Sequence, residues 1–251
     1  MSLTIVTHTT DEPALFGAMA AVVAHRQQGE LLHLPSEFAP QLGADAVQWV
    51  AAAGSLIPSG LLWYERFTDC QASSASDPQA IVDAARERRI VVPWHPGVQN
   101  ENDLCRLRAQ AMAQGVQLQH LSVEPAEQGW HLLRPDSTPA PYGRWYRDRF
   151  GRLVSTPHAT PPANSDPLRI ALVGGRSDQL HVYPATLAAL GDAIDASGRA
   201  VTVDFVDPRQ LDMSLLAQAG GILLPGGSDM LNVPGQIRAA RHALDTGTPC
   251  V

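Results

Sequence analysis

The sequence predicts an α/β protein with two Rossmann-like or flavodoxin-like domains, each built on a parallel sheet. Strand and helix signals alternate through residues 1–133. Residues 134–167 are rich in prolines and small polar residues. A strand, a glycine turn, a helix and a further strand follow one another within 220–251. Such alternation is typical of parallel sheets with helices on both faces. We therefore expect an N-terminal domain (1–133), a linker of extended, poorly packed backbone (134–167) and a second domain (168–251) that is incomplete at its C-terminus.

The elements of the first domain are predicted from local patterns. Short, largely apolar segments that alternate with helical patterns predict strands at 3–7, 30–34, 90–94, 116–123 and 130–133. Helical patterns predict helices at 13–28, 44–53, 78–89 and 101–114, the first of them capped near Asp11 or Glu12. Leu61 to Tyr64 form a short apolar run.

The second domain opens with a buried-type strand at Leu168. Near its end, an apolar strand (222–224) runs into Pro225-Gly226-Gly227, a helix follows at 236–244, and a new apolar run begins at Cys250. Glycines directly after a strand let backbone N–H groups approach a ligand or a developing negative charge. This turn is therefore the first candidate for a functional site.

Composition and charge restrict the function classes. Hydrophobic residues make up 45% of the 251 residues and charged residues 17%, as in an ordinary globular protein. A net charge of −7 argues against general nucleic-acid binding, which needs a basic surplus. Neither a signal-peptide pattern nor an apolar run of transmembrane length occurs. We expect a cytoplasmic protein with no nucleic-acid or membrane partner.

The three cysteines fit a reducing compartment. Cys250 is expected to be packed within a strand rather than presented as a nucleophile, because no adjacent base or exposed turn accompanies it. Cys70 in a loop and Cys105 in a helix have no CxxC spacing and no nearby histidine. We expect no metal site and no cofactor.

Residues 168–251 resemble the glutaminase domain of CTP synthases, within the class I glutamine amidotransferases. The resemblance lies in residues that keep the order and spacing of that domain: Arg169 to Gly174, Tyr183, Leu190, Leu224-Pro225-Gly226-Gly227, Gly235, Ala239-Ala240-Arg241 and Pro249. These residues cover the family's first strand and helix, its strand with a Pro-Gly-Gly turn, the following helix and the start of the next strand.

The resemblance implies an activity and a set of roles. Glutamine would be hydrolysed through a cysteine thioester, and ammonia would pass to an unknown acceptor held by the N-terminal domain. The N–H groups of Gly226 and Gly227 would stabilise the tetrahedral oxyanion, while Ser228 and Asp229 would shape the glutamine pocket. The nucleophile of the family would fall about three residues beyond Val251, and its activating His and Glu have no counterpart in this sequence.

The first domain departs from a CTP synthase. Residues 1–160 contain neither GxxxxGK[ST] nor GxGxxG, so the phosphate loop of the synthetase half is missing. In the second domain, Gly174-Gly175-Arg176 and the segment 179–183 differ from the family at the surface that communicates with the synthetase half. We therefore expect a different partner domain and a different ammonia acceptor.

Three further motifs have two interpretations each. His95, in a His-Pro-Gly sequence after an apolar run, either lines a ligand at the carboxyl end of a strand or is a loop histidine held by local hydrogen bonds. Amidotransferases have an orienting Glu where Gly97 stands, which favours the local interpretation.

The run from Thr7 to Glu12 either binds an anion or caps the following helix, and capping is the commoner role.

The run from Tyr142 to Arg152 either stacks bases or forms a hairpin with solvated arginines, and the acidic composition favours the hairpin.

The leading hypothesis is therefore a class I amidotransferase-like enzyme. The main alternative is a catalytically inactive α/β binding or regulatory module that keeps the sheet and the glycine turn. A third is a peptidase-like relative with a serine at the same elbow. The residue found shortly after Val251 distinguishes the three. An unpaired edge of the second sheet would favour a homo-oligomer.

Overall fold

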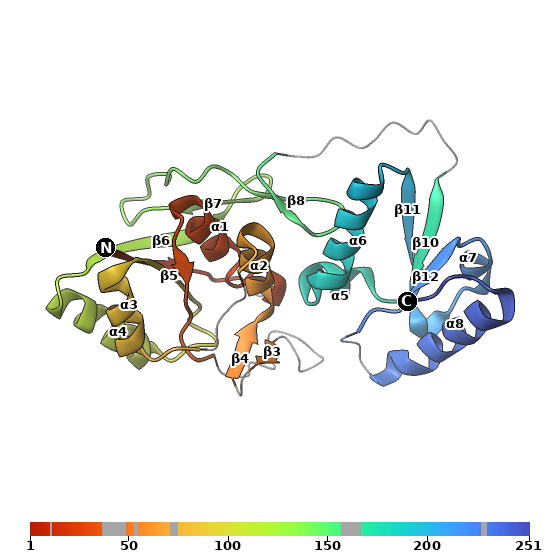
Figure 1. Cartoon of the computed structure of the whole chain (residues 1–251), viewed down its shortest axis with the longest axis horizontal. Coiled ribbons are helices and arrows are strands. Elements are labelled where there is room, and N and C mark those ends of the chain that lie inside the picture. Colours follow the sequence, from red (N-terminus) through yellow and green to blue (C-terminus); the bar gives the residue numbers. More distant parts are fainter. Residues whose placement is uncertain (11, 37–48, 53–54, 71–74, 157–166, 227–229) are drawn as a thin grey trace. The chain divides into compact units, whose positions relative to one another are not determined.

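The structure is a computed structural model that describes residues 1–10, 12–36, 49–52, 55–70, 75–156, 167–226 and 230–251 (Figure 1). The chain divides into two compact units, Met1–Asp148 with Leu153–Pro157 and Arg149–Arg152 with His158–Val251. Both units are Rossmann-like, with a mostly parallel sheet between helices, as the sequence predicts. The domain boundaries proposed at 133 and 168 stay predictions.

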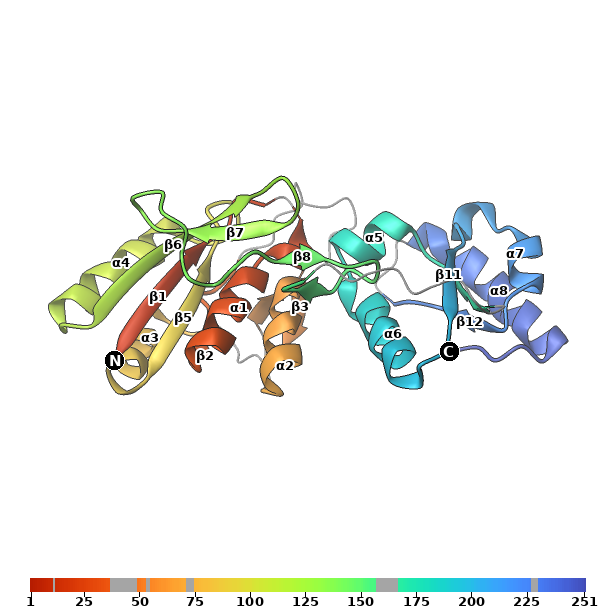
Figure 2. The same cartoon turned by 90° about the horizontal axis from the view of Figure 1, so that it is seen from above.

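The sheet of the first unit has the strand order β2-β5-β1-β6-β7. Its strands are β1 (Ser2–Thr7), β2 (Glu30–Leu31), β5 (Arg89–Trp94), β6 (Gln117–Pro125) and β7 (Trp130–Leu133). Strand β1 lies between β5 and β6 and is parallel to both (Figure 2). Thr7 pairs with Trp94 and with Ser122, so the carboxyl ends of these three strands meet at one edge of the sheet.

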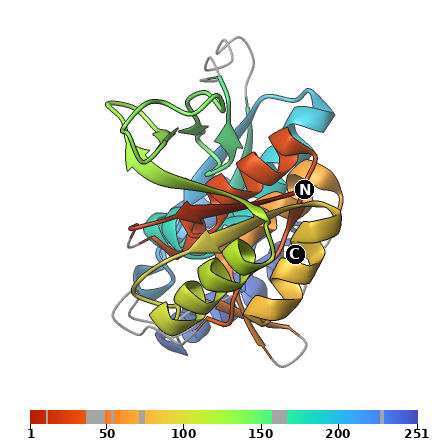
Figure 3. The same cartoon turned by 90° about the vertical axis from the view of Figure 1, so that its left-hand side faces the viewer.

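Helices cover both faces of this sheet (Figure 3). They are α1 (Ala18–Gln27), α2 (Leu62–Thr68), α3 (Pro78–Glu87) and α4 (Glu101–Ala113), with 3-10 turns η1 (Pro13–Leu15) and η3 (Ser59–Leu61). Helices α3 and α4 share a buried core with Leu3 and Ile5 of β1, whereas α1 lies on the opposite face. The start of α3 is well specified, because Asp77 accepts hydrogen bonds from the N–H groups of Gln79 and Ala80.

The helix predicted at 13–28 is interrupted. The turn η1 precedes α1, and Gly17 between them has a φ of 83°. A Cβ at this position would lie 2.4 Å from Cδ2 of Leu61, so only glycine fits. The N-cap of α1 is therefore Gly17 rather than Glu12, while Asp11 lies outside the described residues.

Two other predictions for this unit need correction. The helix predicted at 44–53 is wrong over residues 49–52, which form β3 (Trp49–Ala52) and pair antiparallel with β4 (Ser55–Pro58). Residues 44–48 and 53 lie outside the described residues. Backbone pairing across this hairpin outweighs the helix propensity of the alanines. The strand predicted at 30–34 is ladder-paired only over Glu30–Leu31.

The sheet of the second unit has the order β11-β10-β12, all parallel. Its elements are β10 (Leu168–Leu172), α5 (Arg176–His181), α6 (Pro184–Ser197), β11 (Val201–Phe205), η4 (Pro208–Gln210), α7 (Met213–Ala217), β12 (Gly221–Leu223), η5 (Met230–Asn232) and α8 (Val233–Thr246). Helix α6 packs on one face of the sheet, and α7 and α8 pack on the other (Figures 1 and 2). Neighbouring residues Ala171 and Leu172 therefore point into two different cores.

After α8 the backbone returns to this sheet. Cys250 forms a parallel bridge with Ile222, which agrees with a new strand that begins at Cys250. The expectation that the Cys250 side chain is packed is wrong, because the residue is exposed. Among the described residues, no strand pairs with the segment 249–251 on the side away from β12.

The run from Tyr142 to Arg152 forms the predicted hairpin, in which β8 (Tyr146–Arg147) pairs antiparallel with β9 (Leu153–Val154). Its packing differs from the expectation. Phe150 is buried, and Arg152 is only 3% exposed. Arg152 Nη1 lies 2.8 Å from carboxylate oxygens of both Asp192 and Asp195. The prediction of a solvated arginine is therefore wrong for Arg152, whose ion pairs compensate the buried charge, whereas Arg144 and Arg149 are exposed as predicted. The buried Phe150 likewise contradicts the prediction of poorly packed backbone here.

Gly235 has a steric role in α8. A Cβ on this residue would lie 1.8 Å from the carbonyl oxygen of Pro208 in η4. Gly-to-Ala changes in compatible helix positions usually stabilise a protein. We expect Gly235→Ala to do the opposite and to destabilise the second unit by about 1–3 kcal/mol, because η4 must move. Hydrogen exchange of α8 measures the effect. Arg238→Ala, on the exposed side of α8, is the control and should be close to neutral.

Candidate functional site

The predicted glycine turn follows β12 at the carboxyl edge of the second sheet. Strand β12 lies between β10 and the segment 249–251. Three backbone hydrogen bonds fix this segment: Ile222 N–H to the Pro249 carbonyl (2.8 Å), Val251 N–H to the Ile222 carbonyl (3.0 Å) and Leu224 N–H to the Val251 carbonyl (2.8 Å). The turn therefore leaves the sheet between two parallel neighbours, where open α/β sheets bind ligands.

Two elements hold the start of this turn. Gln236 of α8 donates a hydrogen bond from Nε2 to the carbonyl of Pro225, at 3.0 Å. On the other side, a Cβ on Gly174 would lie 2.9 Å from Cγ of Pro225. The loop after β10 therefore approaches the turn so closely that a side chain at position 174 has no room. Pro225 itself is buried.

Gly226 is the one predicted site residue of the turn that the structure describes. It is exposed, and a Cβ built on it meets no heavy atom within 4 Å. Its N–H group donates to no acceptor among the described residues. Gly227, Ser228 and Asp229 lie outside the described part of the chain.

Gln179 lies beside this turn but has no sequence pattern that marks it as a site residue. Its side chain is 1% exposed, and its Nε2 lies 3.7 Å from the Cβ position of Gly174. Within the described ranges, its Oε1 has no hydrogen-bond donor. A buried acceptor without a donor costs about 1–3 kcal/mol, so a ligand or a further residue that donates here would stabilise the unit.

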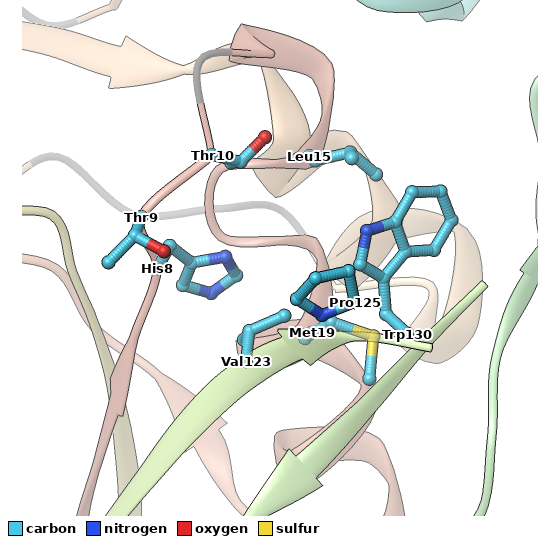
Figure 4. Close-up of a pocket in the computed structure, with 8 residues that line it drawn as sticks. All are labelled: His8, Thr9, Thr10, Leu15, Met19, Val123, Pro125 and Trp130. Carbon is cyan, nitrogen blue, oxygen red and sulfur yellow. The ribbon is translucent and has the colours of Figure 1, made fainter. Parts of the chain in front are cut away.

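A pocket of about 190 Å³ lies in the first unit, at the carboxyl ends of β1 and β6 (Figure 4). It is lined by His8, Thr9, Thr10, Leu15, Met19, Val123, Pro125 and Trp130.

His8 is fully buried, and neither ring nitrogen has a hydrogen-bond partner in the described part of the chain. Burial and the nearby His95 lower the pKa of His8 to about 3, so its imidazole is neutral near pH 7.

The run from Thr7 to Glu12 does not cap α1 as predicted, because the N-cap is Gly17 and no described side chain caps it, and its threonines make other local hydrogen bonds. Thr10 Oγ1 accepts from the Glu12 N–H group at 3.0 Å, and Thr7 Oγ1 lies 2.8 Å from His120 Nε2. Burial and Arg108 lower the pKa of His120 as well. Because His8 is neutral, this region offers an anion no positive charge from that ring. The neutral ring does not favour anion binding, which stays a prediction for this run.

His95 is buried and makes the contacts of a loop histidine. Its Nδ1 accepts from the Gly97 N–H group at 3.0 Å, so its Nε2 donates to the carbonyl of Thr10 at 2.8 Å. Both ring nitrogens are thus paired within the first unit. A substrate-binding role for His95 stays a prediction that these bonds do not support.

The lowered pKa of His8 makes the first unit sensitive to acid. Unfolded His8 titrates near 6.5 and folded His8 near 3, so between these values only the unfolded chain takes up the proton. The free energy of unfolding should therefore fall by about 2–3 kcal/mol from pH 6 to pH 4 through this residue. Urea unfolding at both pH values should show this loss in the wild type but not in His8→Phe. The lowered pKa of His120 adds the same pH dependence to the wild type and to His8→Phe. If the two proteins lost equal stability between pH 6 and pH 4, the assignment of the loss to His8 would be contradicted.

The described residues contain no group of three or more His, Cys, Asp or Glu side chains that could hold a metal ion. No helix in the same ranges is both long and apolar enough to cross a bilayer.

The fold and the turn define a Rossmann-like α/β protein with a glycine turn at the carboxyl edge of its second sheet. Comparison with known proteins adds a partial similarity to CTP synthases. The chain is 33% identical over 86 residues to the CTP synthase of Streptococcus sanguinis, which covers 33% of this chain and 16% of that protein. It is 29% identical over 125 residues to the CTP synthase of Hyphomonas neptunium, which covers 48% of this chain and 21% of that protein.

The chain therefore spans 16–21% of the length of these relatives. No protein-family profile matches it. These findings support a CTP synthase-like relationship for part of the chain.

Proposed function

We propose that the second unit is a class I glutamine amidotransferase-like domain, which hydrolyses glutamine through a cysteine thioester and releases ammonia for an acceptor. The main support is the register of residues 249–251. Cys250 pairs with Ile222, so a strand that continued in this register would bring the third residue after Val251 level with Gly226. Neighbouring strands lie about 4.8 Å apart. A thiol at that position would therefore stand beside the Gly226 amide.

The chemistry of this arrangement matches thioester formation. Attack of a thiolate on the side-chain amide of glutamine forms a C–S bond and moves an electron pair to the amide oxygen. The N–H group of Gly226, which has no acceptor among the described residues, would donate to that oxyanion. Collapse of the intermediate expels ammonia once the leaving nitrogen is protonated, and water then releases glutamate. Gly227 would be the second donor, with Ser228 and Asp229 at the glutamine pocket.

The partial similarity to CTP synthases supports glutamine as the substrate. The first unit has its own sheet and its own pocket, and we propose that the acceptor differs from that of a CTP synthase. Association between copies of the chain stays a prediction.

Release of glutamate from glutamine by the natural polypeptide that contains this chain tests the proposal. We expect glutamate and ammonia in equal amounts, with D-glutamine as an inert control. A protein that binds glutamine without hydrolysing it would be the inactive module considered above. A protein that neither binds nor hydrolyses glutamine would refute both functions.

A further inference from the structure

The pocket beside His8 lies at a switch point of the first sheet. After β1 the chain goes toward β2 on one side, and after β6 it turns to β7 on the other side. The connections that leave the neighbouring strands β1 and β6 at this edge therefore run in opposite directions. Open parallel sheets bind small molecules at such a position. His8 follows β1 directly, and Val123 and Pro125 belong to β6.

The His8 ring packs edge-to-face against Phe16, with ring centroids 5.5 Å apart, but its nitrogens lack hydrogen-bond partners among the described residues. The ring is fully buried, and neither Nδ1 nor Nε2 has a hydrogen-bond partner in the described part of the chain. The backbone N–H of His8 donates to the Trp94 carbonyl at 2.7 Å. Figure 4 shows the imidazole and the Trp130 indole on opposite sides of the pocket. Buried polar groups are nearly always paired, so the unpaired imidazole points to a bound group that the protein does not supply.

The remaining lining restricts the chemistry of that group. The other side chains are two threonines and the apolar Leu15, Met19, Val123, Pro125 and Trp130. None of the eight lining residues carries a carboxylate, an ammonium or a guanidinium group. The Arg147 guanidinium lies over the Trp130 ring, 5.3 Å from its centroid, but it is ion-paired with Glu12. A charged ligand would therefore lose its hydration without gaining a counter-charge from the lining. The flat faces of Pro125 and Trp130 suit a planar ring.

The size of the pocket restricts the ligand further. Its volume is about 190 Å³. An apolar cavity of about 150 Å³ in another protein holds benzene. One ring or two small fused rings therefore fit.

We propose that this pocket binds an uncharged planar ring compound that forms a hydrogen bond with the imidazole of His8 and packs against Trp130. A neutral imidazole has one donor and one acceptor nitrogen, so ligands with a ring N–H, a carbonyl oxygen or a ring nitrogen all qualify. The site is independent of the proposed glutaminase activity, because every lining residue belongs to the first unit.

Titration of the full chain with 2-quinolone, followed by NMR, tests this site. This probe is an uncharged fused bicycle with one N–H and one carbonyl group. We expect saturable binding with shifts of the His8 ring and Trp130 indole resonances. The anion 2-naphthoate, of similar shape, should bind at least about tenfold more weakly, because none of the eight lining residues is a cation and Arg147 over Trp130 is paired with Glu12. Equal binding of the two probes, or no binding of 2-quinolone, would overturn the proposal.

Two variants test the role of the residues. His8→Leu should weaken 2-quinolone binding by about tenfold through loss of one hydrogen bond. Val123→Phe should fill the pocket and abolish binding while leaving His8 in place, which keeps the test decisive if His8→Leu fails to fold. His131→Leu is the matched control, because this residue follows Trp130 on β7 and points to the other face of the sheet. Unchanged binding in both pocket variants would show that the probe binds elsewhere.

Discussion

Replacement of Gly226 by proline should lower kcat for glutamine hydrolysis by about 100–1000-fold, the usual effect of losing one oxyanion donor. Proline has no N–H group, so the substitution removes the donor proposed for Gly226. KM should change much less, because the oxyanion exists only along the reaction path. Steady-state release of glutamate by the natural polypeptide measures both constants.

Gly226→Ala is the matched control for this experiment. Alanine keeps the N–H group, and its Cβ would meet no heavy atom within 4 Å. The φ of Gly226 is outside the left-handed region, so alanine adopts it without strain. We expect kcat of Gly226→Ala to stay within a few fold of the wild type. An equal loss in both variants would show that the open space at this position matters and that the amide does not act as the donor.

Phe150→Ala should destabilise the second unit by about 3–5 kcal/mol, the usual cost of removing a buried phenyl ring. Phe150 is 3% exposed and packs with Leu172, Leu187, Ile194 and Val201. A Cβ on Gly191 of α6 would lie 2.6 Å from Cγ of Phe150, so the ring rests directly on the helix backbone. Its loss would leave a cavity between the hairpin loop and α6.

Hydrogen exchange distinguishes this effect from general unfolding. Amides of β10 and α6 should lose protection in Phe150→Ala, while those of α3 and α4 keep it, because the first unit has a separate core. Arg149→Ala is the control, since exposed Arg149 contacts the same ring at 4.5 Å and contributes only about 0.5–1 kcal/mol. Equal loss of protection in both units would contradict the assignment of Phe150 to the second core.

The elements that the sequence predicts well are those with strong local signals. Strand β5 is an apolar run, and its predicted bounds, 90–94, differ from the observed ones by one residue. Helix α3 begins with the Asp77 cap and Pro78, which specify a helix start without tertiary contacts. The parallel bridge at Cys250 was likewise predictable from a strand, glycine turn, helix and strand in succession.

The elements that the sequence does not predict depend on distant partners. Gly17 interrupts a helical pattern because of Leu61, which only the fold brings beside it. Residues 49–52 read as a helix from their alanines, yet the pairing with β4 makes them a strand. Arg152 reads as a surface residue, and its burial depends on Asp192 and Asp195 of α6.

The same distinction applies to the sites. The sequence locates the turn at Gly226, because glycines after a buried strand are a local pattern. It does not locate the pocket of His8, since Val123 and Trp130 are distant in sequence and meet His8 only in the folded sheet. Gln179 is likewise defined by its neighbour Gly174 in the fold and by no motif.

Mass mapping after treatment with a diazo ketone analogue of glutamine tests the glutaminase proposal most directly. The natural polypeptide should gain one adduct, on a cysteine that follows Val251, and excess glutamine should prevent its formation. Cys250→Ser is the control and should label equally, because Cys250 lies in the strand that leads toward the turn and is not the proposed nucleophile. Absence of an adduct, or labelling of Cys70, Cys105 or Cys250 that glutamine does not prevent, would contradict a thioester mechanism at this turn.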